Sequence, residues 1–312
     1  MTRILEPGQI EAFAQRTVPR VRLPGSEGPF AVRARRLRQL AAPGGPGQAI
    51  ADYLLLMAAV ADAQARALPD FPAAPPTADE IASARVHRMP VIHASGWPRG
   101  AAWRELALSL SSVVTASLPG TPGVREIDRR MSALSVTALE AQADALLAGR
   151  VSEIDVASAP FLMSALQVQW VALASRLKAD EVAPLDIPGV CPVCGTLPVA
   201  SIVRSDAGSQ GYRYLHCALC ATEWHLVRVT CSQCQNTENI GYHSIEGSSG
   251  AIRAESCDRC HTYRKILYQE KDADVEPVAD DLASLGLDLL MAEAGYQRSS
   301  GNPLLWQQPG TA

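Results

Sequence analysis

The chain lacks any segment that would place it in or across a membrane. Its longest strongly apolar run covers residues 54–61, less than half of the roughly 20 residues that a membrane-spanning helix needs. Residues 1–20 contain neither an apolar signal-peptide core nor a small-residue cleavage site. The Arg35-Arg36 pair lies too deep in the chain for a twin-arginine export signal. We therefore expect a cytoplasmic protein without membrane insertion.

Recognisable catalytic motifs are also missing from the sequence. It contains no nucleophile elbow, no phosphate-binding Walker loop, no glycine fingerprint for dinucleotides and no H-E-x-x-H zinc motif. Chemistry of these kinds needs such residues at such spacings, because the reacting groups must converge on one substrate atom. We therefore predict that the protein is not an enzyme.

The cysteines, by contrast, are highly ordered. All eight lie in four C-x-x-C pairs, and the second four follow the first four at a constant offset of 40 residues. Two residues between thiolates let both sulfurs face one ion, and two such turns complete a tetrahedral shell. In a reducing cytoplasm, paired cysteines are metal ligands more often than disulfides. The predicted ligands are Cys191, Cys194, Cys217, Cys220, Cys231, Cys234, Cys257 and Cys260.

We expect the four pairs to close two sites in sequential order, the first two pairs around one ion and the last two around another. Each repeat carries its own complete set of four cysteines, which favours this pairing over a cross-braced one. Gly195 follows the second cysteine and suits a turn with positive φ, whereas Gln235 holds the matching place in the second repeat. The second turn is therefore predicted to be strained or differently shaped.

An all-sulfur tetrahedral shell suits either zinc or iron, so a structural staple and a redox-active metal both stay open at this point. Four of the six histidines, His216, His225, His243 and His261, fall in the same region. Because the sulfur shells are already complete, we interpret these histidines as packing or hydrogen-bonding groups. His216 and His261 adjoin ligand cysteines and are the better candidates for bonding to the shells.

Positive charge is scarce in the part of the chain that carries the cysteines. Residues 186–312 contain 9 Lys and Arg against 15 Asp and Glu, whereas residues 1–185 contain 19 against 17. A nucleic-acid-binding zinc protein neutralises phosphates with clustered Lys and Arg. The charge balance therefore counts against nucleic acid as a partner.

The periodicities predict an α+β multidomain protein. Residues 1–185 show helical periods and few strand signals, which indicates an all-α helical domain of about six helices. Residues 186–270 alternate short β-rich runs with turns, as expected for two tandem rubredoxin-like or zinc-ribbon four-cysteine modules. Residues 271–312 read as a C-terminal helix and tail. The expected helices include 46–68, 101–118, 128–147, 159–178 and 278–296, and the expected strands are 199–204, 212–216, 224–229 and 263–268.

Several stretches resemble the formate dehydrogenase accessory protein FdhE family. They are CPVCGTLPVAS from Cys191, RYLHCALCATEWH from Arg213, RVTCSQC from Arg228, CDRC from Cys257, ADDLASLGLDLLM from Ala279 and GNPLL from Gly301. The resemblance implies a cytoplasmic maturation factor that binds the catalytic subunit of respiratory formate dehydrogenase and is needed for its activity. It also implies that the eight cysteines hold two metal ions, with iron favoured and zinc as the alternative.

A mechanistic hypothesis follows from this resemblance. The acidic ribbons and the helix with Asp280 and Asp281 would recognise the immature dehydrogenase, and the metal sites would order that surface or sense redox state. Two other functions stay open: a rubredoxin-like iron redox carrier and, less favoured by the charge, a zinc-ribbon regulator that binds nucleic acid. The sequence predicts no oligomeric state.

Overall fold

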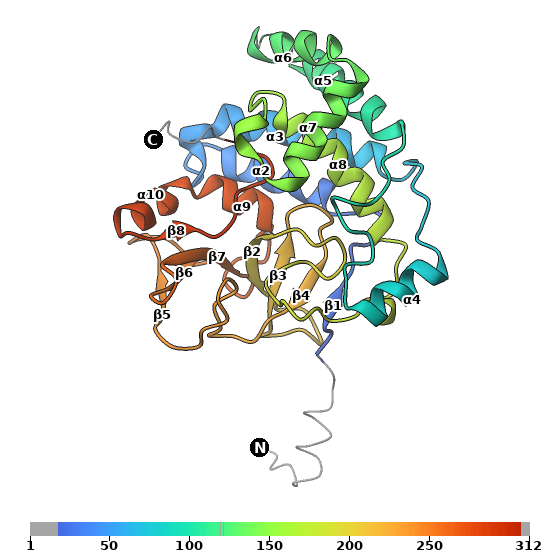
Figure 1. Cartoon of the computed structure of the whole chain (residues 1–312). Helices are drawn as coiled ribbons and strands as arrows, with labels where there is room; N and C mark the ends of the chain where they lie inside the picture. Colours follow the sequence, from blue (N-terminus) through green and yellow to red (C-terminus); the bar gives the residue numbers. More distant parts are fainter. Residues whose placement is uncertain (1–17, 119, 121, 307–312) are drawn as a thin grey trace.

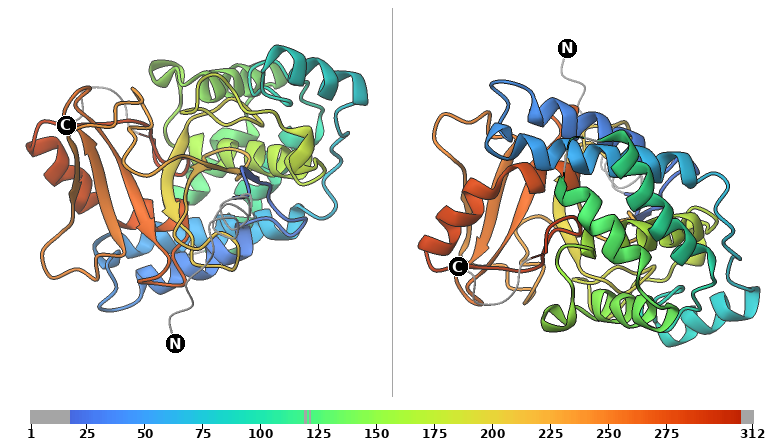
Figure 2. Two further views of the ribbon diagram at one scale, coloured as in Figure 1. Left: turned by 90° about the horizontal axis from the view of Figure 1, so that it is seen from below. Right: turned by 90° about the horizontal axis from the view of Figure 1, so that it is seen from above.

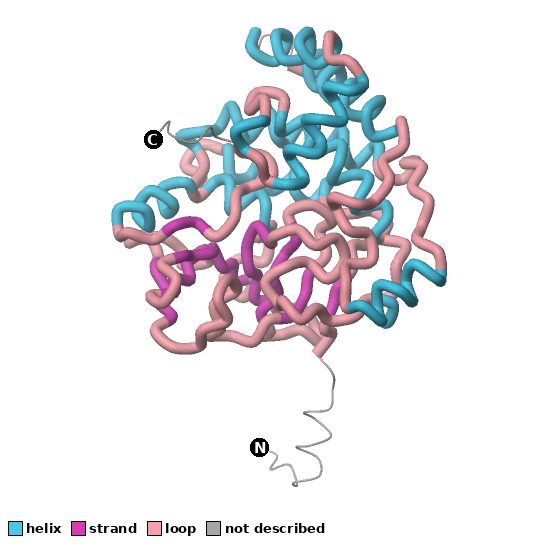
Figure 3. The backbone as a smooth tube through the Cα atoms, in the orientation of Figure 1, coloured by secondary structure: helices cyan, strands magenta, loops and turns pink. Residues whose placement is uncertain are grey.

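The computed structural model describes residues 18–118, 120 and 122–306. Most helices from the first half of the chain gather on one side of the molecule, and the strands lie together below them in Figure 1, where α4 (Ala78–His87) lies lower, beside the strands. Figure 3 shows that long loops connect the strands on the side away from these helices. Within this part of the chain, no helix combines the length and apolarity that a bilayer crossing needs.

Helix α8 (Ala159–Ala174) is the centre of the helical part, because every one of its residues is buried. A helix that is apolar nearly all round has no face suited to water. Its polar side chains bond to distant segments instead. The amide of Gln167 donates to the carbonyl of Ala218 at 2.7 Å, and the indole of Trp170 donates to the carbonyl of Ile92 at 3.1 Å. The other helices of this part are α2 (Phe30–Ala41), α3 (Ala51–Ala67), α4 (Ala78–His87), α5 (Ala102–Ser117), α6 (Pro122–Ser132) and α7 (Val136–Ala148), with short 3-10 turns at Gln48–Ile50, Val151–Glu153 and Ala179–Glu181.

The strands form one eight-stranded sheet in the order β1-β4-β3-β2-β7-β6-β5, with β8 beside β7. The offset of 40 residues relates β2 to β5, β3 to β6 and β4 to β7, so each cysteine repeat is one three-stranded antiparallel unit. The left view of Figure 2 shows the two units side by side. The strands are β1 (Val21–Arg22), β2 (Pro198–Val203), β3 (Arg213–Cys217), β4 (Glu223–His225), β5 (Ile240–His243), β6 (Ile252–Cys257), β7 (Thr262–Tyr268) and β8 (Gln297–Arg298).

A parallel pairing of β2 with β7 joins the two units head to tail. Ser201 faces Ile266, Ile202 faces Leu267 and Val203 faces Tyr268. Both ends of the described chain also enter the sheet, since β1 pairs with β4 and β8 pairs with β7. The helical region therefore contributes one short strand, although its sequence predicts only helices.

Two helices that the sequence predicts as continuous are each divided, so those two predictions are wrong. The helix expected at residues 128–147 ends as α6 and restarts as α7, where the Ser135 hydroxyl accepts the backbone N–H of Ala138 at 3.1 Å. The helix expected at residues 278–296 consists of α9 (Pro277–Ala283) and α10 (Leu285–Glu293), which meet at Ser284. In both places a serine hydroxyl bonds to nearby backbone groups and competes with the continuing helix.

The division between α9 and α10 is stabilised from the sheet. At this point the ammonium of Lys265, on β7, donates to the carbonyls of Asp281 and Ser284 at 2.8 and 3.1 Å. The same carbonyls also accept backbone N–H groups three residues on, that of Asp281 from Ser284 at 3.4 Å and that of Ser284 from Leu287 at 3.1 Å. The ammonium adds a charged donor to carbonyls at this helix end, where the regular pattern of helical bonds stops. The sequence pattern of 278–296 cannot reveal the division, because the group that satisfies it lies elsewhere in the chain.

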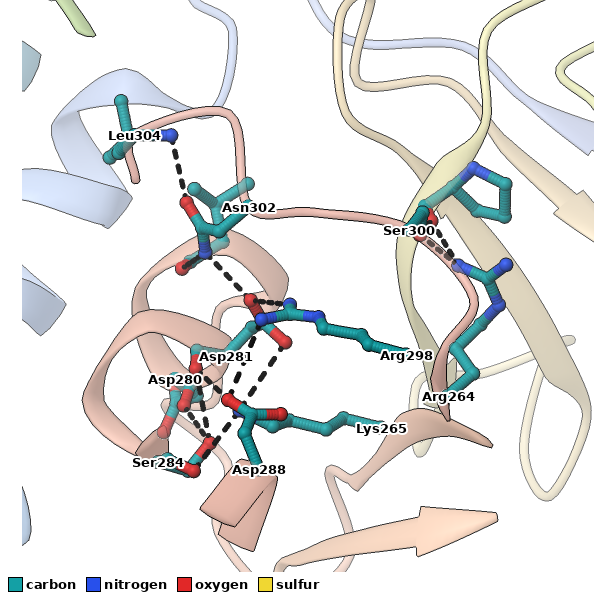
Figure 4. A network of polar contacts seen from close by, with 12 residues as sticks. Arg264, Lys265, Asp280, Asp281, Ser284, Asp288, Arg298, Ser300, Asn302 and Leu304 are labelled. Carbon is teal, nitrogen blue, oxygen red and sulfur yellow. Dashed lines mark hydrogen bonds and ion pairs between the residues drawn. The ribbon is translucent and has the colours of Figure 1, made fainter. Parts of the chain in front are cut away.

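Asp280 and Asp281 are fully buried, and their carboxylates hold the molecule together. Asp280 pairs with Arg36 of α2 at 2.6 Å, whereas Asp281 pairs with Lys265 and Arg298 (Figure 4). Burial alone would raise the pKa of Asp281, but the two positive charges outweigh it and lower the pKa below its usual value. The hypothesis that this acidic pair recognises a partner is therefore wrong, because neither carboxylate reaches the surface.

Removing a charged partner from this buried cluster should lower the stability of the protein substantially. Lys265→Met leaves Asp281 and two backbone carbonyls without their ammonium partner, so we expect the free energy of unfolding to fall by about 3–5 kcal/mol. Urea denaturation followed by circular dichroism measures the change. The matched control is Arg38→Ala, because the Arg38–Asp62 pair is exposed and should contribute less than about 1 kcal/mol. Similar losses for the two variants would contradict this reading of the cluster.

Candidate metal centres

The structure gathers the eight sulfurs into two groups of four, in the sequential order that the repeat predicts. Within each group the sulfurs lie within 4.8 Å of one another. The cross-braced alternative is thereby ruled out for the fold. The first site comprises Cys191, Cys194, Cys217 and Cys220, and the second comprises Cys231, Cys234, Cys257 and Cys260.

The sulfur separations fit metal shells and not disulfides. In the first site Cys194 and Cys217 place their sulfurs 3.3 Å apart and Cys191 and Cys220 place theirs 3.5 Å apart, and the two matching pairs of the second site are each 3.7 Å apart. A tetrahedron with metal–sulfur bonds of about 2.3 Å places its sulfurs about 3.8 Å apart. A disulfide would need about 2.05 Å. The second site thus already has the spacing of a tetrathiolate shell, and the first is slightly contracted.

The four cysteine turns share one backbone conformation. The residue after each pair has a positive φ: 78° at Gly195, 57° at Ala221, 62° at Gln235 and 52° at His261. The prediction for Gly195 is confirmed. Gln235 adopts the same conformation and donates its N–H to the carbonyl of Cys231 at 3.0 Å. The left-handed backbone conformation costs a residue with a Cβ about 1–2 kcal/mol. The turns at Ala221, Gln235 and His261 are therefore strained, whereas the turn at Gly195 is not.

The first site lies between the helices and the sheet. The loop after α4 bonds to its first turn, since Ile92 donates to the carbonyl of Val193 and Ala94 to that of Cys194, both at 2.9 Å. Gln167 of α8 bonds to its second turn. The four cysteines are at most 1% exposed and belong to the main apolar core. The first site therefore ties the helical region to the sheet.

Threonine hydroxyls surround the sulfurs of the first site. The Thr196 hydroxyl lies 3.1 Å from the sulfurs of both Cys194 and Cys217, and the Thr222 hydroxyl lies 3.1 Å from that of Cys220. Hydrogen bonds to a thiolate favour its charged form. These contacts suit sulfurs that carry negative charge without access to water.

The second site is more open and has fewer such contacts. Cys234 and Cys260 are only half-buried, and none of the four cysteines belongs to the main apolar core. Asn236 occupies the position of Thr196, and its side-chain nitrogen is 3.9 Å from the sulfur of Cys257. The Thr262 hydroxyl retains its place 3.1 Å from the sulfur of Cys260. The two sites therefore have the same cysteine arrangement and turn conformation, but the second is more exposed to solvent.

Comparison with known proteins identifies the family. Family models described as "FdhE, N-terminal", "FdhE, central domain" and "FdhE, C-terminal domain" match residues 18–186, 190–228 and 229–305. The chain belongs to the FdhE family. Two FdhE relatives, "Protein FdhE homolog" of Cronobacter sakazakii and "Protein FdhE" of Escherichia coli, are 40% and 38% identical over 99% of each chain. The crystal structure of the FdhE protein from Pseudomonas aeruginosa matches with a TM-score of 0.79 at 34% identity, over 93% of this chain and 99% of that one.

In this FdhE chain, each site contains one thiol whose pKa is lowered. Burial raises the pKa of Cys257, but hydrogen bonds from the backbone N–H groups of Cys260 and Arg259 outweigh it and bring the pKa to about 7. Cys217 occupies the same position in the first site, and its pKa is also lowered. Burial raises the pKa of Cys231 to about 12. Four thiolates can coexist in such a site only with a cation among them.

The structure does not bring the candidate histidines onto the sulfurs. The Nδ1 of His216 lies 3.1 Å from a carboxylate oxygen of buried Glu223, and the ring of His261 faces Tyr296. The Nε2 of His243 lies 2.8 Å from the hydroxyl of Ser256. The ring of His225 contacts two tyrosines, Tyr212 and Tyr214. These histidines pack and bond as the sequence predicts, but His216 and His261 do so away from the shells.

One neighbour of the first site could not be found from the sequence. His93 lies so close to Gly195 that a Cβ there would be 3.2 Å from the imidazole Cδ2. His93 also lines a cavity of about 540 Å³ beside Cys194, between α7, α8 and the C-terminal tail. Met163 and Trp306 line its other walls. No local motif marks these residues, because segments far apart in the sequence meet only in the fold.

The shared turn conformation predicts opposite effects of two substitutions. Gly195→Ala adds a Cβ to left-handed backbone, 3.1 Å from the Pro90 Cγ, and should lower the free energy of unfolding by at least about 1 kcal/mol. Gln235→Gly removes a Cβ from the same conformation and should raise it by up to about 1 kcal/mol. Thermal unfolding of the purified protein measures both. Shifts of the same sign would contradict a common strain at these turns.

Proposed function

We propose that this protein is a cytoplasmic accessory factor that binds the catalytic subunit of respiratory formate dehydrogenase and supports its maturation without catalysing a reaction. Family membership supports this role, and so do the two four-sulfur sites in the C-terminal half. The single observation that carries the proposal is the placement of the second site. Its half-buried sulfurs lie at one end of the sheet, where a metal can order a surface that a partner protein contacts.

Each site, in this proposal, holds one metal ion through its four cysteines. The metal supplies a permanent cross-link between two turns, which a small sheet with a limited core needs. The resemblance to the family favours iron, and zinc is the alternative. At the first site the cross-link fixes the sheet beneath the helices. At the second it fixes the turns that lead into β5 and out of β6.

A redox carrier is the second candidate function, and the exposure of the second site favours it. Half-buried sulfurs give a bound iron ion a short route to an electron-exchange partner, whereas the first site is sealed. A visible absorption band that is lost and regained with reductant and oxidant would support this alternative. A colourless zinc protein that still binds the dehydrogenase subunit would contradict it and leave the accessory role.

Binding of the catalytic subunit tests the proposed function directly. The purified protein should retain this subunit on an affinity column, and the double variant Cys231→Ser, Cys257→Ser should bind it at least about tenfold more weakly, a loss of about 1.4 kcal/mol. The control is Gln233→Ala, an exposed side chain between two of the cysteines. No binding by the native protein would contradict the function. Full binding by a folded double variant would contradict the role of the second site.

The difference in exposure predicts the order of metal loss. With a chelator in excess, one ion per chain should leave at least about tenfold faster than the other, because the first site can open only by local unfolding. Metal content followed over time gives the two rates. Alkylation mapped by mass spectrometry should label Cys234 and Cys260 before Cys191 and Cys194. Simultaneous loss of both ions, or earlier labelling of the first site, would contradict the assignment.

A further inference from the structure

Strand β5 is the free edge of the sheet. In the described part of the chain it pairs only with β6, and the strand order ends with it. The opposite edge is occupied by β1, which covers β4. A strand at a sheet edge presents backbone N–H and C=O groups that can pair with another extended segment.

The internal repeat shows what this kind of edge accepts. Strand β2 is the counterpart of β5 in the first unit, and its equivalent edge is filled by β7 in parallel register. The three residues of β2 that pair there are Ser201, Ile202 and Val203. Register against the middle strand gives the equivalent residues, because a β-bulge between Pro198 and Ala200 shifts β2 by one residue relative to the offset of 40. Ser201 and Ile202 face Leu215 and Tyr214, and their counterparts on β5, which face Glu255 and Ala254, are Tyr242 and His243. The same backbone edge is thus paired in one unit and open in the other.

We propose that the β5 edge binds an extended, apolar segment of a partner polypeptide, which adds to the sheet as a parallel strand in the way that β7 adds to β2. The chemistry of the segment follows from the strand that fills the equivalent edge. In β7 the paired residues are Ile266, Leu267 and Tyr268. All three have large apolar side chains, and the β-branched Ile266 and the aromatic Tyr268 are of the types that favour strands.

The surroundings of the edge fit an apolar occupant. Tyr242 is 39% exposed and Ile245, just beyond the strand, is 41% exposed. On the adjacent helix α10, Leu289 and Leu290 are 67% and 48% exposed. Ile245 reaches this helix, since its Cδ1 would lie 3.7 Å from a Cβ at Gly286. A docked segment could therefore bury apolar side chains in addition to its backbone pairing.

A second copy of this chain fits the edge less well. Head-to-tail addition would require the outer edge of its β4, the counterpart of β7, and β1 already pairs there through Val21 and Arg22. An extended segment of a different protein need not have its pairing edge occupied in this way. The second metal site also supports the edge, because Ile240 at the start of β5 pairs with Cys257. This inference rests on the proposed function only for the identity of the partner.

The strand that fills the equivalent edge supplies the probe. A peptide with the sequence of residues 262–269, TYRKILYQ, is added at millimolar concentration to the intact metal-loaded protein. Amide hydrogen exchange should slow at least about tenfold at residues 240–243. The control peptide carries Ile266→Pro and Leu267→Pro, which remove one N–H donor from each edge of the strand, and it should give no protection.

The outcomes separate this inference from the proposed function. No protection of β5, equal protection by the proline peptide, or protection only elsewhere would overturn the inference. Self-association through β5 in an ultracentrifuge would overturn the choice of occupant. The dehydrogenase subunit should compete with the peptide. If the subunit binds without competing, the inference fails and the function stands; if the peptide protects β5 but the subunit does not bind, the function fails and the edge site stands.

Discussion

The parallel pairing of β2 with β7 is the contact on which the rest of the architecture depends. It joins two copies of the same three-stranded unit head to tail, and a head-to-tail contact gives its two members different neighbours. The first unit therefore meets the helices and buries its sulfur site in the main core. The second unit forms the other end of the sheet, with two of its four cysteines half-buried and, in the described part of the chain, the outer edge of β5 without a partner strand. One repeated sequence thus produces a sealed site and an accessible site.

Buried ion pairs fix this arrangement against the helices and the tail. Arg33 of α2 pairs with Glu276 at 3.1 Å, and Arg213 of β3 pairs with Glu255 of β6 at 2.7 Å, where all four side chains are buried. Part of the acidic balance of the C-terminal half is therefore internal, because some of its carboxylates pair with buried cations. Removing one partner from such a pair is costly, whereas exposed pairs contribute little.

The sequence is most informative where structure depends on local spacing. The two sulfur groups follow from C-x-x-C pairs at a fixed offset, and α5 and α8 follow from regular apolar stripes. The division of the C-terminal helix at Ser284 depends on Lys265, and the strands β5 and β6 have no clear alternation of apolar and polar residues. The burial of Asp281 and the different exposure of the two sites arise only when distant segments pack. No local pattern in the sequence predicts these features, because they depend on contacts between distant segments.

The central claim is that each repeat holds one metal ion through four sulfurs and no other ligand. X-ray absorption at the edge of the bound metal, combined with metal analysis of the same sample, tests it most directly. The account predicts two ions per chain, each with four sulfur neighbours at about 2.3 Å. Nitrogen or oxygen ligands in the shells, or fewer than two ions in the fully loaded protein, would contradict it.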